Sequence, residues 1–439
     1  MAKAGTIDEV LGDGGPSAGG KPRGFWRQFL VFVGPGYLVA TGYMDPGNWA
    51  TSIAGGSAFG YQLLFVALAS SVMAIIMQSL AARLGIASNR DLAQMCREAL
   101  PRPVSLMLWA LAELAICATD LAEVIGTAIG LNLLFGIPIG VGTLLTAADV
   151  FLILALQRLG FRWIEAFVMA LLILIAVCFF GQVLLARPDW KAVAAGLVPP
   201  VNLISNPTAL YLAIGMIGAT VMPHNLYLHS SLPQTTRDLG ESIDQRRRSL
   251  QLVTLDTVIA LLFALVINAS IIIIAAAAFN AHGQSAVTDI SDAYRLISPL
   301  LGAPLAATLF AIALLACGFN STITATLSGQ IVMEGFLHIR LPNWLRRLVT
   351  RAIAIVPAIV TVLWFGEASI GRLLILSQVV LSLQLPFAMF PLLAFTANRG
   401  AMGALVAPRW LTGLGLAVAV LISGLNVWLI VQLLAPAQS

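Results

Sequence analysis

Apolar runs long enough to cross a membrane recur along almost the whole length of this 439-residue chain. Each run has about 18 residues or more, which is the length that a helix needs to span the hydrocarbon core of a bilayer. Charged residues make up only 10% of the chain, whereas a soluble domain has about 25%. We therefore predict an all-α polytopic membrane protein.

The apolar pattern predicts eleven spans. Their approximate limits are 28–53, 59–84, 104–132, 139–157, 163–184, 208–231, 252–279, 300–333, 345–363, 371–396 and 408–434. With the N-terminus in the cytoplasm, 20 of the 24 Lys and Arg residues fall in cytoplasmic segments. A miscounted span would scramble this asymmetry, so the charges favour a cytoplasmic N-terminus and an outside C-terminus.

The two ends of the chain differ in composition from the rest. Residues 1–24 are polar and glycine-rich, and we interpret them as a disordered cytoplasmic tail rather than a cleavable signal peptide. Residues 25–434 then form a single transmembrane domain. The four cysteines show no CxxC or zinc-site spacing, which favours small buried residues over disulfides.

Two of the predicted spans are interrupted. Span 1 contains GYMDPGNWATS at residues 42–52, where Pro46 removes a backbone donor and Gly47 destabilises a helix. Span 6 contains a second weak point around Pro223. Inside a membrane, a broken helix is tolerated only where it lines a cavity or packs against protein.

The two breaks occupy matching places. They lie in the first spans of two five-span blocks, 25–184 and 208–396, and residues 408–434 form an extra helix. Because five is odd, the blocks are inverted relative to each other. Broken helices at corresponding places in inverted repeats indicate the midplane binding site of a transporter.

The residues near the breaks suit a divalent metal of intermediate softness. Asp45 offers a carboxylate, Asn48 an amide oxygen, Met222 a thioether, and unwound backbone near Ala219 a carbonyl. Thioether ligands favour transition ions over Ca²⁺ and Mg²⁺, so the set points to Mn²⁺ or Fe²⁺. In span 10, Gln378 could add an oxygen, and Gln384 is a similar candidate; either could instead hydrogen-bond to a neighbouring helix.

The motifs DPGN (Asp45 to Asn48) and MPH (Met222 to His224), with eleven spans, resemble the natural resistance-associated macrophage protein (Nramp) family, and within it the bacterial proton-coupled manganese transporters. The resemblance covers residues 25–434. It implies a LeuT-type fold and symport of a divalent metal with protons. It also implies that the ligands are Asp45, Asn48, Met222 and the carbonyl of Ala219. A magnesium-transporting branch lacks the methionine, so Met222 favours a transition metal.

Span 3 carries three acidic residues, Glu113, Asp120 and Glu123, within roughly 80° of one helix face. Acidic residues inside a membrane are candidates for function. The resemblance supports Asp120 and Glu123, with Arg351 of span 9, as a proton pathway, and Glu113 less so. A static ion pair between spans 3 and 9 is the alternative.

Coupling follows from charge, because a divalent ion favours ionised Asp45 and expels its proton. His224 could carry that proton or could shape the site by hydrogen bonding. We interpret His229 as structural. Asp149 and Asp256 have no assigned role beyond contacts between helices, and Asn268 could support the site.

The sequence also bears on other classes of function. The chain has no HExxH, GxGD, GxSxG or P-loop motif, so we predict that it is not an enzyme. A cation-coupled transporter of a small organic substrate, a magnesium transporter and a passive metal channel are the alternatives. We expect no permanently bound cofactor, no nucleic acid and no obligatory protein partner. The expected partners are the transported metal ion, protons and the lipid of the bacterial inner membrane.

Overall fold

Helices make up nearly all of the structure, a computed structural model that describes residues 35–146, 161–200, 203–235, 242–338 and 369–434 together with positions 345, 349, 353, 356, 360 and 364. No strand occurs in these described parts. The longer helices are α4 (Pro46–Phe59), α5 (Leu64–Ser88), α7 (Arg102–Phe135), α10 (Phe161–Ala186), α12 (Pro207–Val221), α14 (Ile243–Ala278), α15 (Ile290–Leu301), α16 (Pro304–Leu337), α18 (Ile370–Ala397) and α20 (Arg409–Leu434). The shorter ones are α3 (Pro35–Gly42), α6 (Leu92–Ala99), α8 (Ile139–Leu145), α11 (Trp190–Ala195), α13 (Pro223–Ser231), α19 (Arg399–Met402), η1 (Gly60–Leu63), η3 (Leu232–Thr235), η4 (Asn280–His282) and η6 (Gly403–Leu405).

Eight stretches of the described chain are long and apolar enough to cross a membrane. They correspond to predicted spans 1 and 2 taken together, 3, 5, 6, 7, 8, 10 and 11. The predicted spans 139–157 and 345–363 fall largely outside the described residues. The eight stretches therefore agree with a polytopic helical protein, and the total of eleven stays a prediction.

Helix α14 begins nine residues before the predicted start of its span, at Ile243 instead of 252. The reason is a capping box, in which the Ser242 side chain accepts from the Gln245 backbone while the Gln245 side chain accepts from the Ser242 backbone. This cap starts the helix in a charged segment. Hydropathy alone detects only the part of the helix that is apolar, and so it places the start too late.

The broken helices lie inside the bundle, and the other long helices surround them. Helix α12 packs along α18, α7 packs along α16, and α14 contacts both α4 and α5. The approach of α12 to α18 depends on Gly218, because a Cβ there would collide with the backbone carbonyl of Gln378. Small residues of this kind let membrane helices pack closely.

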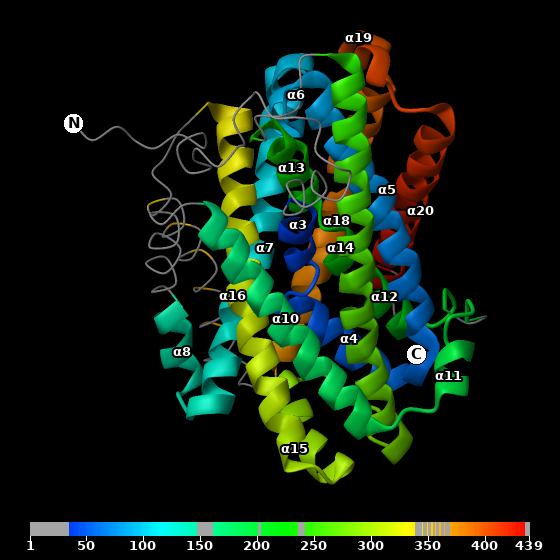
Figure 1. Cartoon of the computed structure of the whole chain (residues 1–439). Coiled ribbons are helices and arrows are strands. Elements are labelled where there is room, and N and C mark those ends of the chain that lie inside the picture. The colour runs from blue at the N-terminus through cyan, green and yellow to red at the C-terminus, as the bar shows by residue number, and fades with distance from the viewer. Residues whose placement is uncertain are drawn as a thin grey trace, which may run out of the picture.

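Short helices mark the two ends of the bundle. Figure 1 shows α6 and α19 at one end, and α11 and α15 near the other. The predicted span order puts the first pair in cytoplasmic segments and the second pair in outside segments. The arrangement is the one that this order requires, and the side that each end faces stays a prediction.

Candidate functional site

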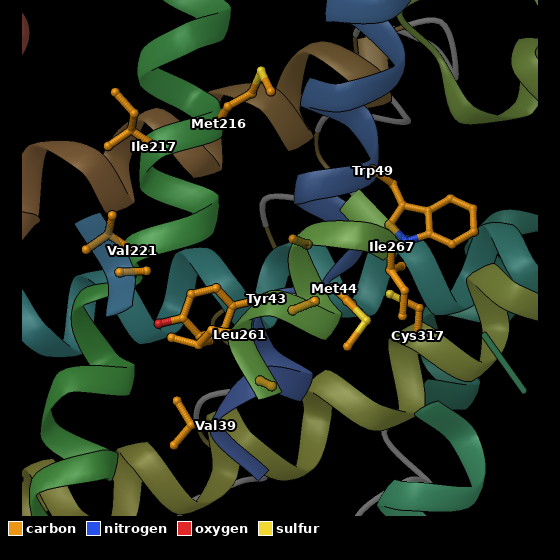
Figure 2. Close-up of a cluster of buried hydrophobic side chains, with 14 of the residues drawn as sticks. Val39, Tyr43, Met44, Trp49, Met216, Ile217, Val221, Leu261, Ile267 and Cys317 are labelled. Carbon is orange, nitrogen blue, oxygen red and sulfur yellow. The ribbon is translucent and has the colours of Figure 1, made fainter. Parts of the chain in front are cut away.

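The first break is a three-residue gap between α3 and α4. Helix α3 ends at Gly42 and α4 begins at Pro46, so Tyr43, Met44 and Asp45 lie between them. Figure 2 shows Tyr43 and Met44 among buried apolar side chains, with Val39 on the preceding turn. The predicted break at Pro46 and Gly47 is thus displaced, because proline is well tolerated as the first residue of a helix.

Asp45 caps the second half of this broken helix. Its Oδ1 accepts from the Asn48 amide at 2.9 Å, and its Oδ2 accepts from the Gly47 amide at 3.3 Å. The side chain is fully buried. The start of α4 therefore directs backbone N–H groups and the positive end of the helix dipole at the Asp45 carboxylate.

The Tyr43 carbonyl oxygen fixes the orientation of two amide side chains. Asn48 Nδ2 donates to it at 2.6 Å, and Asn268 Nδ2 donates to it at 2.8 Å. Because the amide nitrogen of Asn48 is engaged in this way, its Oδ1 is the atom left for a ligand. This geometry suits the predicted role of Asn48 and gives Asn268 a supporting one.

The second break is a single residue. Helix α12 ends at Val221, α13 begins at Pro223, and Met222 between them has a φ of 43°. A left-handed conformation costs a non-glycine residue about 1–2 kcal/mol. The backbone around Ala219 is helical, so our expectation of unwound backbone there is wrong. Its carbonyl is available for another reason: the residue four positions later is Pro223, which has no N–H to donate.

Gln378 of α18 joins the two breaks. A Cβ on Gly47 would collide with Gln378 Nε2 and lie beside Asp45 Oδ2, so this amide covers the first break. The Gln378 backbone carbonyl packs against Gly218, one turn before the second break. Gln378 Nε2 donates to Ser377 Oγ at 3.0 Å, and its Oε1 has no hydrogen-bond partner among the described residues. Gln384 is buried six residues further along the same helix.

Together these groups form a donor set with one carboxylate. Within the described parts of the chain, no three His, Cys, Asp or Glu side chains gather closely enough to hold a metal ion. A cation at the breaks would instead meet Asp45, neutral amide and carbonyl oxygens, and the Met222 thioether. Oxygen donors with one soft sulfur suit Mn²⁺ and Fe²⁺ better than Ca²⁺ or Mg²⁺.

The acidic residues predicted for span 3 lie on α7. Asp120 and Glu123 are buried, and Glu113 is half-buried. Glu123 Oε2 accepts from Thr322 Oγ1 of α16 at 2.9 Å. Gly126, one turn further along α7, has no room for a Cβ because the Pro46 ring packs against it. The acidic stripe therefore reaches the start of α4, next to Asp45.

His224 connects the second break to the same helix. Its Nδ1 lies 3.4 Å from Thr119 Oγ1. Thr119 directly precedes Asp120 in the sequence and lies one helical turn before Glu123. Its Nε2 has no hydrogen-bond partner in the described parts of the chain. Arg351, the predicted partner on span 9, lies outside the described residues, as does Asp149.

Three other buried polar side chains, those of His229, Gln78 and Asp256, hold neighbouring helices together. His229 Nδ1 lies 3.0 Å from Gln78 Oε1, and Gln78 Nε2 donates to Tyr43 Oη at 2.8 Å. Asp256 Oδ2 accepts from the Gly36 amide at 2.7 Å and so holds the start of α3. These contacts connect α3, α5, α13 and α14, and they agree with our interpretation of His229 as structural.

Three polar residues at the site were missed in the sequence: Thr119, Thr322 and Asn225. Threonine is common inside membrane helices, so nothing distinguished the first two. Asn225 did carry a signal, because DPGN at 45–48 and MPHN at 222–225 share the pattern X-Pro-x-Asn. Comparing the two motifs with each other would have found it.

Comparison with known proteins gives a consistent result. A family model described as natural resistance-associated macrophage protein-like matches residues 36–432. The divalent metal cation transporter MntH of Agrobacterium fabrum is 61% identical over 407 residues, which cover 93% of this chain and 88% of that protein. The crystal structure of the Eremococcus coleocola manganese transporter, in complex with an aromatic bis-isothiourea substituted compound, matches with a TM-score of 0.86 and 40% identity, covering 96% of this chain and 92% of that one.

A more distant likeness bears on the fold alone. The crystal structure of MhsT in complex with L-phenylalanine matches with a TM-score of 0.57 at 15% identity, covering 91% of this chain and 97% of that one. Identity this low says nothing about substrate. It does support the predicted LeuT-type architecture.

Proposed function

This chain belongs to the natural resistance-associated macrophage protein family, and we propose that it imports divalent transition-metal ions together with protons across the bacterial cytoplasmic membrane. Mn²⁺ is the main proposed substrate, with Fe²⁺ and similar ions beside it. The chain is a multi-pass membrane protein whose relatives are transporters rather than enzymes. We propose eleven spans, a cytoplasmic N-terminus and an outside C-terminus.

One observation carries the proposal: two helices are interrupted next to each other, and each break presents a donor that lipid could not accommodate. Gln378 covers Asp45 with its side chain and packs against Gly218 with its backbone, so the breaks face one small region. Asp45 supplies the charge, Asn48 and Ala219 supply oxygens, and Met222 supplies sulfur. We propose these four as the ligands, with Gln378 joining them when the site closes.

Proton coupling follows from the charge of the site. A divalent cation binds the ionised form of Asp45, so binding releases any proton held there. His224 adjoins the second break and contacts Thr119 of α7, the helix of Asp120 and Glu123. We propose that the released proton passes from the site to His224, then along Asp120 and Glu123 towards Arg351. Glu113, half-buried on the same helix, is the weakest member of this pathway.

Transport then proceeds by alternating access. Gln78 of α5 bonds to Tyr43 at the first break and to His229 of α13, and Asn268 of α14 bonds to the Tyr43 carbonyl. Helix α12 packs against α4 and α5. We propose that the broken helices α3–α4 and α12–α13, with α5 and α14, rock as one bundle against the other helices around a fixed site, as in transporters with inverted repeats. This scheme needs no resident cofactor and no obligatory protein partner.

Flux in proteoliposomes tests the proposal. We would measure Mn²⁺ uptake and internal pH together, at outside values of about pH 5.5 and pH 7.5, for wild type and Asp45→Asn. The proposal expects saturable uptake with internal acidification, both lost in the variant. Non-saturating uptake without acidification would indicate a passive channel. Absence of Mn²⁺ uptake in wild type, or unchanged uptake in Asp45→Asn, would contradict the metal site.

A further inference from the structure

The two breaks share the sequence pattern X-Pro-x-Asn, at residues 45–48 and 222–225. Of the two asparagines, only the first has a role in the proposed function. In each motif a residue outside the helix precedes a proline that begins a half-helix, and an asparagine is the third residue of that half-helix. Asn48 is the asparagine of α4 and a proposed ligand. Asn225 is its counterpart on α13, and it is completely buried beside the second break.

Asn225 touches both broken helices. Its Nδ2 lies 3.4 Å from Met222 Sδ and 3.4 Å from the carbonyl oxygen of Val39. The Val39 carbonyl is available because the amide of Tyr43 donates to Ala40 instead. The contact is close, since a Cβ on Gly42 would collide with Asn225 Nδ2.

The chemistry of these neighbours fixes the orientation of the amide. Both atoms that face Nδ2, a carbonyl oxygen and a thioether sulfur, are acceptors. Turning the amide over would place Oδ1 against two electron-rich atoms, which is unfavourable. The nitrogen therefore faces Met222, and one sulfur lone pair accepts its N–H.

The arrangement has a cost that an apolar residue would avoid. Asn225 Oδ1 is buried and has no hydrogen-bond partner among the residues that the structure describes. An unsatisfied buried acceptor destabilises a fold, and leucine of similar size would remove this one. An asparagine here supplies a nitrogen that donates to the Val39 carbonyl and to the Met222 thioether, and only the second of these contacts reaches a proposed metal ligand.

We propose that Asn225 is the positioning residue of the Met222 thioether. By engaging one lone pair of the sulfur, it directs the other towards the cation and so sets the preference of the site for thiophilic ions such as Cd²⁺ over Mn²⁺. The inference rests on the proposed function, because it takes Met222 as a ligand. A free methionine side chain rotates among many conformations. Holding the Met222 thioether in its ligand orientation before binding lowers the entropic cost of forming the metal–sulfur bond, and thiophilic ions gain most from this.

Calorimetric titration of the purified full chain with Cd²⁺ and with Mn²⁺ tests this role. Asn225→Leu keeps the volume and removes the donor, and we expect the ratio of Cd²⁺ to Mn²⁺ affinity to fall about three- to tenfold. Met222→Ala should lower the ratio further. In the double variant the leucine should add nothing, because its effect passes through the sulfur.

Asn268→Leu is the matched control. It removes another buried amide donor that holds a carbonyl of the first break, but none of its hydrogen bonds involves sulfur. Its affinities for both metals should change by a common factor, leaving the ratio at the wild-type value. A ratio that falls equally in Asn268→Leu would show a general structural effect and would overturn the proposal.

The remaining outcomes separate this inference from the function beneath it. If Met222→Ala lowers the ratio and Asn225→Leu does not, Asn225 has no positioning role. If Asn225→Leu lowers the ratio equally with and without Met222, its effect does not pass through the thioether. If wild type binds neither metal, or Met222→Ala leaves the ratio unchanged, the ligand role of Met222 fails as well. X-ray absorption of the Cd²⁺ complex gives a second readout, in which Asn225→Leu should weaken the Cd–S signal.

Discussion

The two breaks are built in different ways. In the first, the gap of three residues is held by hydrogen bonds on every side: two backbone amides reach Asp45, and two side-chain amides reach the Tyr43 carbonyl. In the second, one residue with a φ of 43° separates two helices. Its backbone amide donates to the Gly218 carbonyl at 3.3 Å, and its sulfur is contacted by Asn225.

From this difference we propose that the first break determines binding strength and the second determines metal selectivity. The first break fixes a negative charge in place with several donors, and such an arrangement provides strong binding to any small dication. The second break places a soft atom with little redundancy, so we propose that it controls which dication is preferred. Variants in the first break should change affinity for all metals, and variants in the second should change the order of preference.

The largest effect is expected from removing the charge. Asp45→Ala should lower Mn²⁺ affinity on the order of 100-fold or more, because a buried charged partner contributes about 2–5 kcal/mol. Cd²⁺ affinity should fall to a similar extent, and calorimetry measures both. Loss of affinity for Mn²⁺ alone would contradict the division between the breaks.

Removing the sulfur should have a smaller and more selective effect. Met222→Ala should retain some Mn²⁺ uptake while admitting Ca²⁺ or Mg²⁺ better, because the remaining donors are all oxygen. Competition of each ion against Mn²⁺ uptake in proteoliposomes measures the change. An unchanged order of preference would remove the second break from the account of selectivity.

The two prolines provide a sharper comparison. Pro223→Ala supplies an N–H that can bond to the Ala219 carbonyl across the single-residue break. Because this hydrogen bond is worth about 1 kcal/mol and competes with the metal for the carbonyl, Mn²⁺ affinity should fall several-fold. Pro46→Ala is the matched control, because a gap of three residues already separates α3 from α4. Titration with Mn²⁺ should show a larger loss of affinity in Pro223→Ala than in Pro46→Ala. The reverse order would contradict the idea that Pro223 keeps the Ala219 carbonyl available.

His224 should affect protons more than metal. His224→Gln keeps a hydrogen-bonding side chain near Thr119 but removes the imidazole that we propose as the proton relay, so internal acidification per Mn²⁺ should fall by about half or more. Thr119→Val, which removes the hydroxyl alone, is the comparison. If uptake and acidification fall in the same proportion in His224→Gln, the histidine shapes the site and carries no proton.

The smallest effect concerns the end of α13 that lies against α6. There, the Leu92 amide of α6 donates to Ser230 Oγ at 2.9 Å, and Asp91 caps α6. Burial raises the pKa of Asp91 to about 7. The backbone amides of Gln94 and Ala93 and the charge of Arg97 oppose this rise, and the charge of Glu334 adds to it. A raised pKa means that the folded state favours the protonated form, so this stabilisation is complete below about pH 4 and is lost as pH rises through about 7.

Asp91→Asn tests that contribution. Asparagine keeps the cap and carries no charge, so the variant should unfold at a higher temperature than wild type at pH 8 and at a similar temperature near pH 4. Thermal unfolding at the two pH values measures the difference. A variant less stable than wild type at pH 8 would show that ionised Asp91 stabilises this end.

Much of the site could be predicted from local sequence. Asp45 and Pro46, and Met222 and Pro223, are visible because polar or helix-breaking residues stand out in apolar runs. The position of the first break was harder to predict, because a proline that starts a helix resembles one that interrupts it. The packing of Asn225 against the first broken helix could not be predicted, because Val39 lies 186 positions away in the sequence. The start of α14 was lost because its first turns are polar.

We propose that the two breaks hold one cation between them. Anomalous diffraction from crystals of the protein grown with Mn²⁺, recorded at the manganese absorption edge, locates the ion directly. We expect one strong peak within coordination distance of Asp45 and Met222, and its loss in Asp45→Ala. A peak that contacts only one of the two breaks, or that persists in Asp45→Ala, would contradict it.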